Sequence, residues 1–170
     1  MNGPSEQEIT RQRLVELLNE DLSREYQAII AYTIFSQVIK GAQYMTIARE
    51  LEEHAKEELE HARKLSKQID YFGERPTSKP QPVPALNTAE EMLRFDLQAE
   101  NDTIRHYRTR IRQAEALGEY GLARDLREII RDEQDHQIEL ATALGIDVPK
   151  DGLGEETGYI PSQSTSISAT

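Results

Sequence analysis

The sequence predicts an all-α protein, a four-helix bundle with a long crossover between the second and third helices. Three observations lead to this fold class. Apolar residues recur every three or four positions along four segments, while the alternation typical of strands is nowhere sustained. Each of these segments stops at a glycine. The middle connection is much longer than the other two, which are only a few residues long and therefore join antiparallel neighbours.

The first helix is expected to begin after Ser5, which forms a capping-box pattern with Glu8, and to close at Gly41. Its inner face is defined by helical spacing and consists of Leu14, Leu18, Leu22, Glu25, Ile29, Tyr32, Phe35 and Ile39. The second helix is expected from about Ala42 to Phe72, before Gly73. Its inner face consists of Leu51, Ala55, Glu58, Ala62, Leu65, Ile69 and Phe72. Both apolar faces thus contain a glutamate.

The third helix is expected to begin at a capping box of Thr88 and Glu91 and to end before Gly118. The fourth is expected from about Glu119 to Leu144, closed by Gly145. The inner face of the third helix consists of Leu93, Leu97, Glu100, Ile104, Tyr107, Ile111 and Ala114. That of the fourth consists of Leu122, Leu126, Ile129, Glu133, Leu140 and Ala143. A glutamate again interrupts each apolar face.

The connection at residues 73–87 contains four prolines, which forbid a helix and favour extended chain. At about 3.1 to 3.3 Å per residue it reaches roughly 45 to 50 Å. This is enough to cross a bundle of helices that are about 40 to 50 Å long, so the second and third helices are expected to be parallel. We expect one four-helix domain at residues 1–145 and an irregular or disordered tail at residues 146–170, which lack apolar periodicity.

The composition limits the classes of function. The formal charge of -11 argues against a nucleic-acid binder, and direct DNA binding by the acidic tail is not expected. The absence of cysteine excludes disulfides and thiolate metal sites. No secretory pattern occurs at the N-terminus, and no apolar run approaches the ~18 residues of a membrane span. We therefore expect a soluble, cytoplasmic protein without a membrane partner.

An internal repeat is the strongest functional signal. A shift of 75 residues places "ARELEEHAKEELEH" at 48–61 on "ARDLREIIRDEQDH" at 123–136. The same shift makes these pairs: Glu25 with Glu100, Tyr32 with Tyr107, Glu58 with Glu133, and His61 with His136. The lone glutamate precedes the Glu-x-x-His pair by 33 residues in both halves. Duplication alone explains the equal spacing, but it does not explain why carboxylates occupy core positions.

Metal binding explains these carboxylates. A buried ionised carboxylate costs on the order of several kcal/mol unless it is paired or bound to a metal, and converging carboxylates repel one another. Two divalent cations would neutralise four carboxylates, and two neutral imidazoles would complete the sites. Residues i and i+3 share a helix face, so each Glu-x-x-His pair can serve one centre. Oxygen-rich ligation with one imidazole per metal suits iron, with manganese or zinc as substitutes, and bridging carboxylates place the metals about 3.5 to 4 Å apart.

This arrangement resembles the ferritin-like di-iron superfamily, which has a Glu from each of two helices and a Glu-x-x-His from each of the others. Within it the sequence is most similar to bacterioferritin, in "LNEDLSREYQAIIAY", "EEMLRFDLQAE", "ELEH" and "EQDH", over roughly residues 10–145. The resemblance implies bridging roles for Glu58 and Glu133 and terminal roles for Glu25 and Glu100. His61 and His136 would each bind one metal. It also implies a catalytic role for Tyr32, which matches a tyrosine near the metals.

The same resemblance implies a ferroxidase, which oxidises Fe(II) with dioxygen or hydrogen peroxide and stores iron in a homo-oligomeric cage. The sequence departs from bacterioferritin at Leu59, where the family has a haem-ligating methionine, so haem is not expected. No counterpart of the family's short fifth helix is apparent. This favours a 12-subunit cage, as in Dps-like proteins with a bacterioferritin-type site, over 24 subunits or a dimer. The alternative function is a discrete di-iron or di-manganese oxidase, peroxidase or catalase without iron storage.

Several neighbouring residues have plainer interpretations. A solvated or ion-paired side chain is the favoured interpretation of His54, with support of a metal ligand as the alternative. Tyr107 is expected to be a packed aromatic with a hydrogen-bonded hydroxyl. The following acids are interpreted as a solvated helix face with lysine partners: Glu50, Glu52, Glu53, Glu57 and Glu60.

Overall fold

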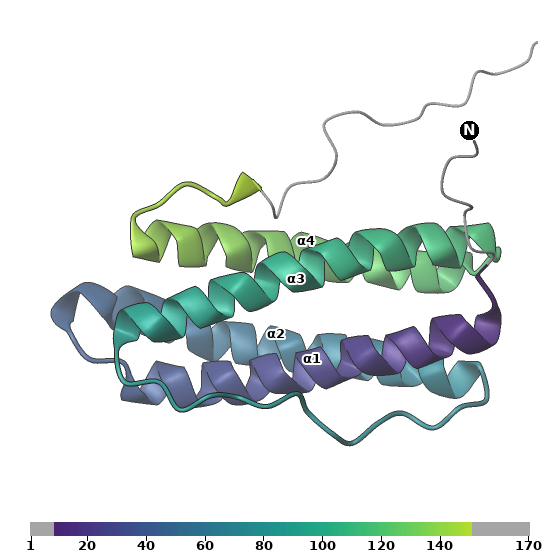
Figure 1. Cartoon of the computed structure of the whole chain (residues 1–170), viewed down its shortest axis with the longest axis horizontal. Coiled ribbons are helices and arrows are strands. Elements are labelled where there is room, and N and C mark those ends of the chain that lie inside the picture. Colours follow the sequence, from purple (N-terminus) through teal and green to yellow (C-terminus); the bar gives the residue numbers. More distant parts are fainter. Residues whose placement is uncertain (1–8, 151–170) are drawn as a thin grey trace, which may run out of the picture.

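The computed structural model describes residues 9–150. Four long helices lie side by side in a bundle (Figure 1), and a short 3-10 turn, η1, leads into the second of them. Their bounds are α1 Arg11–Val38, η1 Ala42–Tyr44, α2 Met45–Tyr71, α3 Ala89–Ala116 and α4 Tyr120–Leu144. The described part of the chain contains no strand, and none of its helices has the length and hydropathy needed to span a membrane. The predicted all-α four-helix bundle is confirmed.

The start of α1 differs from the sequence prediction. The helix begins at Arg11, and Thr10 is its N-cap, with the Thr10 hydroxyl accepting a hydrogen bond from the backbone N–H of Arg13 at 3.2 Å. Residues 9 and 10 are not helical, so a helix that begins after Ser5 is wrong. Threonine satisfies a free N–H group of the first turn without needing a glutamate three residues later. The Ser5 and Glu8 pair itself lies outside the described residues.

The other helix ends lie within a few residues of the predicted ones. The largest differences are that α1 ends at Val38, ahead of Gly41, and that α2 begins at Met45, after the η1 turn. Thr88 and Glu91 form a complete capping box, in which each side chain accepts a hydrogen bond from the other residue's backbone N–H. Gly145 adopts the left-handed conformation, with φ of 68°, at the C-terminal end of α4. A β-carbon is unfavourable in that conformation, so glycine can end the helix there with the least conformational strain. Beyond it, residues 146–149 are not helical, and residues 151–170 of the expected tail lie outside the described part.

The connection between α2 and α3 runs the length of the bundle along α1 (Figure 1). Hydrogen bonds join the backbone of this connection to side chains at three successive positions along α1. The Thr77 N–H donates to the Asn19 side chain at 2.7 Å, the Ser23 hydroxyl donates to the Lys79 carbonyl at 2.6 Å, and the Gln27 side chain donates to the Pro82 carbonyl at 2.6 Å. These contacts satisfy polar groups that proline-rich chain cannot pair within itself. The crossover therefore leaves α2 and α3 parallel, as predicted.

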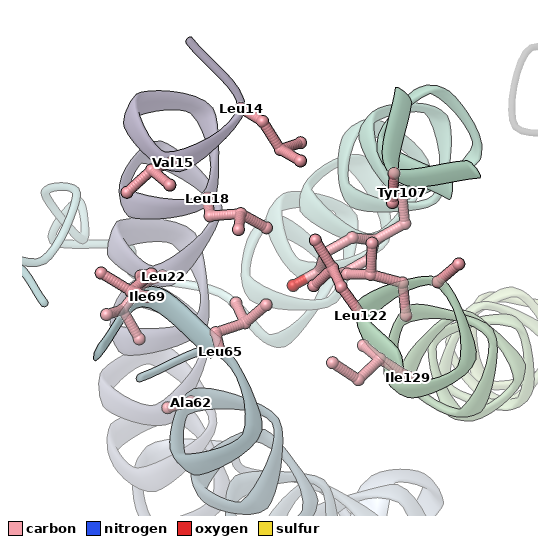
Figure 2. Close-up of a cluster of buried hydrophobic side chains, with 13 residues drawn as sticks. Leu14, Val15, Leu18, Leu22, Ala62, Leu65, Ile69, Tyr107, Leu122 and Ile129 are labelled. Carbon is pink, nitrogen blue, oxygen red and sulfur yellow. The ribbon is translucent and has the colours of Figure 1, made fainter. Parts of the chain in front are cut away.

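Two apolar clusters fill the bundle, one toward each end. The first, shown in Figure 2, consists of Leu14, Val15, Leu18, Leu22, Ala62, Leu65, Ile69, Tyr107, Ala114, Leu122, Ala123, Leu126 and Ile129. The second consists of Ala31, Tyr32, Phe35, Ile47, Leu51, Met92, Leu93, Leu97, Leu140 and Ala141. On α1 the stretch between the clusters runs from Leu22 to Ala31 and contains Glu25. The bundle thus has a polar layer between two apolar ones.

Removal of the α3 cap should lower stability measurably. In Thr88→Ala the hydroxyl that accepts from the Glu91 N–H is lost, which typically costs about 1 kcal/mol. For a domain of this size the midpoint of thermal unfolding should fall by about 2 to 4 °C. Thr33→Ala, at an exposed helical position of α1, is the matched control and should not lower it, because alanine has the higher helix propensity. Circular dichroism would measure both, and equal midpoints would contradict the assigned cap.

Candidate metal centre

The six residues singled out in the sequence come together in the polar layer of the bundle. Each helix contributes, and each of the six is at most 3% exposed. They are Glu25 of α1, Glu58 and His61 of α2, Glu100 of α3, and Glu133 and His136 of α4. They are buried because they occupy the inner faces of helices whose flanking positions are apolar. The structure therefore brings together all six predicted ligands.

The six side chains form two overlapping groups. In one, ligand atoms of Glu25, Glu58, His61 and Glu133 all lie within 4.8 Å of one another. In the other, ligand atoms of Glu58, Glu100, Glu133 and His136 do so. Only Glu58 and Glu133 belong to both. This is the arrangement in which two carboxylates bridge two cations while a glutamate and a histidine complete each position.

The histidine rings present the same nitrogen to the centre. The Nδ1 atom of His61 lies 3.4 Å from Glu25, 3.2 Å from Glu58 and 3.3 Å from Glu133. The Nδ1 atom of His136 lies 3.2 Å from Glu58, 3.5 Å from Glu100 and 3.3 Å from Glu133. Each imidazole thus faces three carboxylates, at distances that leave room for a cation among them.

Unsatisfied atoms support the fit of a metal. Five buried atoms of the centre have no hydrogen-bond partner: Oε2 of Glu25, Oε1 of Glu58, both carboxylate oxygens of Glu133, and Nδ1 of His136. Buried polar atoms rarely remain without a partner. Oxygen and imidazole nitrogen are also the donor types that divalent iron, manganese and zinc accept. The residues therefore fit a pair of divalent cations.

The electrostatics of the metal-free centre are those of a site that needs positive charge. Burial, followed by the nearby Glu133 and Glu25, raises the pKa of Glu58 well above its usual value. Burial and the charge of Glu133 raise the pKa of Glu100 to about 8. Burial opposes a proton on His61, but Glu133 and its neighbours outweigh burial and raise the pKa of the imidazole. Protons thus supply the missing charge, and cations that bind must displace them.

Two tyrosines bind the terminal glutamates in a crossed pattern. The Tyr32 hydroxyl, from α1, donates to Oε1 of Glu100 on α3, and the Tyr107 hydroxyl, from α3, donates to Oε1 of Glu25 on α1. Both rings are almost completely buried, each in one of the apolar clusters. Burial, followed by the glutamate charge that each faces, raises both tyrosine pKa values well above the usual one. The expectation of a packed Tyr107 with a hydrogen-bonded hydroxyl is confirmed.

Two further carboxylates hold the outer edges of the histidines. Nε2 of His136 donates to Glu57 at 2.7 Å, and Nε2 of His61 donates to Asp132 at 3.3 Å. A carboxylate accepts hydrogen bonds, so these contacts keep a proton on Nε2 of each ring. When a cation displaces the second proton that the raised pKa holds on the ring, the Nδ1 lone pair is the one that faces the centre. The hydrogen bond from His136 also lowers the pKa of Glu57.

The interpretation of Glu57 as part of a solvated face is therefore incomplete. Glu57 and Asp132 are equivalent in the repeat, because each directly precedes the glutamate of a Glu-x-x-His pair. That equivalence was a signal in the sequence. It could not be separated from ordinary surface charge, because several other glutamates lie close to Glu57 on the same helix.

His54 is buried rather than solvated. Its ring is 2% exposed and stacks on His136, with ring centroids 4.0 Å apart and planes inclined by 29°. Its Nε2 donates to Glu139 at 2.7 Å. The acidic partner of the favoured interpretation is therefore present, but the contact is an ion pair only when the ring is protonated. Burial, and then the charge of His136, lower the pKa of His54 to about 4. The solvated interpretation is wrong because the side chain lies between α2 and α4.

The fold and the centre define the class of protein: a helical bundle that carries a buried carboxylate and histidine cluster. The family model for the ferritin-like domain matches residues 15–147, and the chain belongs to the ferritin-like di-iron superfamily. It is similar to the bacterioferritin of Brucella melitensis biotype 1, with 27% identity over 135 residues that cover 79% of this chain and 84% of that protein.

A solved structure shows the same likeness in three dimensions. It is described as one of the "ferritin like, diiron-carboxylate proteins" from Bacillus anthracis str. Ames. The two chains are 33% identical, and the superposition has a TM-score of 0.76 and covers 80% of this chain and 99% of the other. The resemblance noted from the sequence is thus confirmed at the level of the superfamily.

The outer carboxylates should be needed for tight metal binding. In Glu57→Gln and Asp132→Asn the imidazole keeps a neutral partner but loses a charged one. We expect the affinity for cobalt(II) to fall about tenfold to a hundredfold in each variant, because partners of ligating histidines raise the basicity of the ring. Glu60→Gln, at an exposed position of the same helix, is the control. Titration followed by visible absorption gives the affinities, and three indistinguishable values would refute the assigned role.

Proposed function

We propose that the protein is a ferroxidase that oxidises Fe(II) with dioxygen or hydrogen peroxide at the buried centre and stores the iron in a homo-oligomeric cage. The observation that carries the proposal is the pair of overlapping ligand groups that share Glu58 and Glu133. Two ferrous ions give up one electron each. Dioxygen accepts both electrons with two protons to give hydrogen peroxide, or hydrogen peroxide accepts them with two protons to give two water molecules.

The side chains have separate tasks in this proposal. Glu58 and Glu133 bind both ions and hold them close together, so that two electrons are available at one place. Glu25 with His61, and Glu100 with His136, each complete the ligands of one ion. The four carboxylates compensate for the positive charge of ferrous ions in a dry interior. Iron is thus both the substrate and the stored product. Manganese or zinc would occupy the centre as substitutes without being stored.

Tyr32 is proposed as the catalytic tyrosine. Its hydroxyl donates to Glu100, and its ring lies edge-on to His136 with centroids 6.1 Å apart. The hydroxyl therefore holds a proton beside the position where the oxidant is reduced, and reduction consumes protons. Tyr107 occupies the equivalent place beside Glu25 and provides a natural comparison.

Exposed apolar residues support assembly with further copies of the chain. Ile30, Ile34 and Val38 follow one another at intervals of four residues on α1 and are 37%, 46% and 43% exposed. Residues at this spacing share one helix face. Such a face on a soluble bundle is typical of a contact surface. A cage of 12 subunits is the proposed assembly. Haem is not part of the proposal, because Leu59 stands where the haem-ligating methionine would be.

Iron titration tests the proposed activity. The metal-free protein is loaded anaerobically with increasing Fe(II) and then exposed to air, while ferric absorbance is followed. We expect a fast phase that saturates at about two irons per chain, followed by slower growth of mineral. In Glu58→Ala and Glu133→Ala the fast phase should be lost, because each variant lacks a ligand of both ions. Oxidation of unaltered protein no faster than in buffer would remove the proposal.

The assembled mass separates storage from simple catalysis. Twelve chains of 19.4 kDa would form a particle of about 230 kDa, which size-exclusion chromatography with light scattering resolves readily. Fast oxidation by a dimer that accumulates no mineral would favour the discrete oxidase, peroxidase or catalase instead.

A comparison of the two tyrosines tests the catalytic role of Tyr32. Tyr32→Phe should slow the fast phase about tenfold or more while leaving the amount of Fe(II) bound unchanged, because the hydroxyl contacts a ligand rather than the ion. Tyr107→Phe removes the equivalent hydroxyl on the other side and should slow it much less. Stopped-flow absorbance gives the rates. Equal rates in the two variants would show that Tyr32 has no special role.

A further inference from the structure

The repeat makes the surroundings of the two histidine ligands directly comparable, and they differ. Seven residues before His61 the chain has His54, whereas seven residues before His136 it has Ile129. The repeat has the proposed ligands in both halves, but it has a polar ring at one of these positions and an aliphatic side chain at the other.

A second difference between the two halves lies three residues after each histidine ligand. Glu139 follows His136 at this interval, and Lys64 follows His61. Glu139 is the residue that accepts the hydrogen bond of His54. The hydrogen-bonded pair of His54 and Glu139 therefore has no equivalent in the other half of the bundle.

The pair of His54 and Glu139 directly contacts one of the proposed metal ligands, His136. The ring of His54 stacks on that of His136 at 4.0 Å between centroids and lies edge-on to Tyr32 at 5.2 Å. The carboxylate of Glu139, whose side chain is 44% exposed, binds the outer nitrogen of His54 at 2.7 Å. A continuous path of contacts thus leads from a surface charge to an imidazole of the centre.

One side of His136 borders a cavity. A cavity of about 240 Å³ lies between α2 and α4. It is lined by His54, His136, Ile138 and six carboxylates: Glu50, Glu53, Glu57, Asp132, Asp135 and Glu139. A ring that borders a cavity lacks the close packing that fixes side chains in a protein core. The edge of His136 is held by Glu57, and its face is held by His54.

We propose that His54, held by Glu139, is a positioning residue for the His136 imidazole and makes the metal position at Glu100 and His136 different from that at Glu25 and His61. The stacked ring fixes the plane of His136 and so aims the Nδ1 lone pair. The hydrogen bond to Glu139 fixes His54 in turn. This inference rests on the proposed function, since it assumes that both positions bind a cation.

Cobalt(II) titration of the metal-free protein tests the inference without any oxidation step. Unaltered protein should bind two ions per chain. Glu139→Ala alters an exposed side chain and leaves the core intact, and His54→Phe keeps a ring in the stack but cannot bond to Glu139. Each variant should lower the affinity for one of the two cobalt ions about tenfold to a hundredfold. It should also change the visible spectrum of that ion alone. Glu139→Gln keeps an acceptor and should restore most of the affinity.

The control and the assignment use other residues. Asp135→Ala removes an exposed carboxylate of the same cavity that does not bond to His54, and it should leave both affinities unchanged. The titrations are then repeated with one ligand removed. In the His61→Ala background, Glu139→Ala should lower the affinity for the cobalt ion that is still bound tightly. In the His136→Ala background, Glu139→Ala should leave that affinity unchanged.

The possible outcomes separate the inference from the proposed function. Failure of the unaltered protein to bind two cobalt ions would count against the metal centre itself. Binding of two ions whose affinities are unaffected by Glu139→Ala and His54→Phe, or equally reduced, would overturn the inference alone. A lower unfolding temperature with both affinities unchanged would also overturn it, because that result indicates a purely structural role.

Discussion

The constraint on which the rest of the structure depends is the burial of four carboxylates in one layer of the bundle. Their mutual repulsion and their lost hydration would oppose folding unless positive charge accompanies them. Without metal, that charge comes from protons, as the raised pKa values of Glu58, Glu100 and His61 show. With metal, two divalent cations would balance it. Binding of cations at this layer would therefore be linked to folding stability. The apolar clusters on either side keep water from relaxing the constraint.

The twofold repeat shows how one helical hairpin, used twice, meets this constraint. Each half supplies a terminal glutamate, a Glu-x-x-His pair, a tyrosine and an outer acid. The partners are exchanged between the halves: Tyr32 binds Glu100, and Glu57 binds His136. Neither half can therefore complete its own ligand environment. The long crossover, bound along α1, permits the parallel arrangement of α2 and α3 that lets the two hairpins face each other.

Much of this could be predicted from the sequence because it depends on periodicity and spacing. Glu25 stood out because Leu22 and Ile29 flank it on the same face, and the equal spacing of two Glu-x-x-His pairs indicated a common centre. The features that were missed depend on side-chain direction. An acid such as Glu57 has the same sequence signature whether it faces water or a histidine of the opposite helix. The burial of His54 likewise depends on the packing of α4 against α2, which no local pattern contains.

The two halves differ in how each compensates the charge of a buried aspartate beside the layer. Asp21 and Asp96 are equivalent in the repeat, and both are buried. Asp21 accepts a hydrogen bond from Arg110 at 2.8 Å, whereas the position equivalent to Arg110 is Phe35. Asp96 therefore lacks that guanidinium partner, its Oδ2 has no hydrogen-bond partner, and burial raises its pKa well above the usual value.

Protonation of Asp96, which its burial favours, would remove a negative charge one turn from Glu100, while the Arg110 guanidinium compensates for the charge of Asp21 one turn from Glu25. Both halves thus keep the net charge near their terminal glutamate low, one by protonation and the other by an ion pair. Low charge around the ligands leaves the four carboxylates as the dominant attraction for a cation in the interior. The same requirement, that every buried charge be compensated, thus governs both the ligands and the residues one turn away from them.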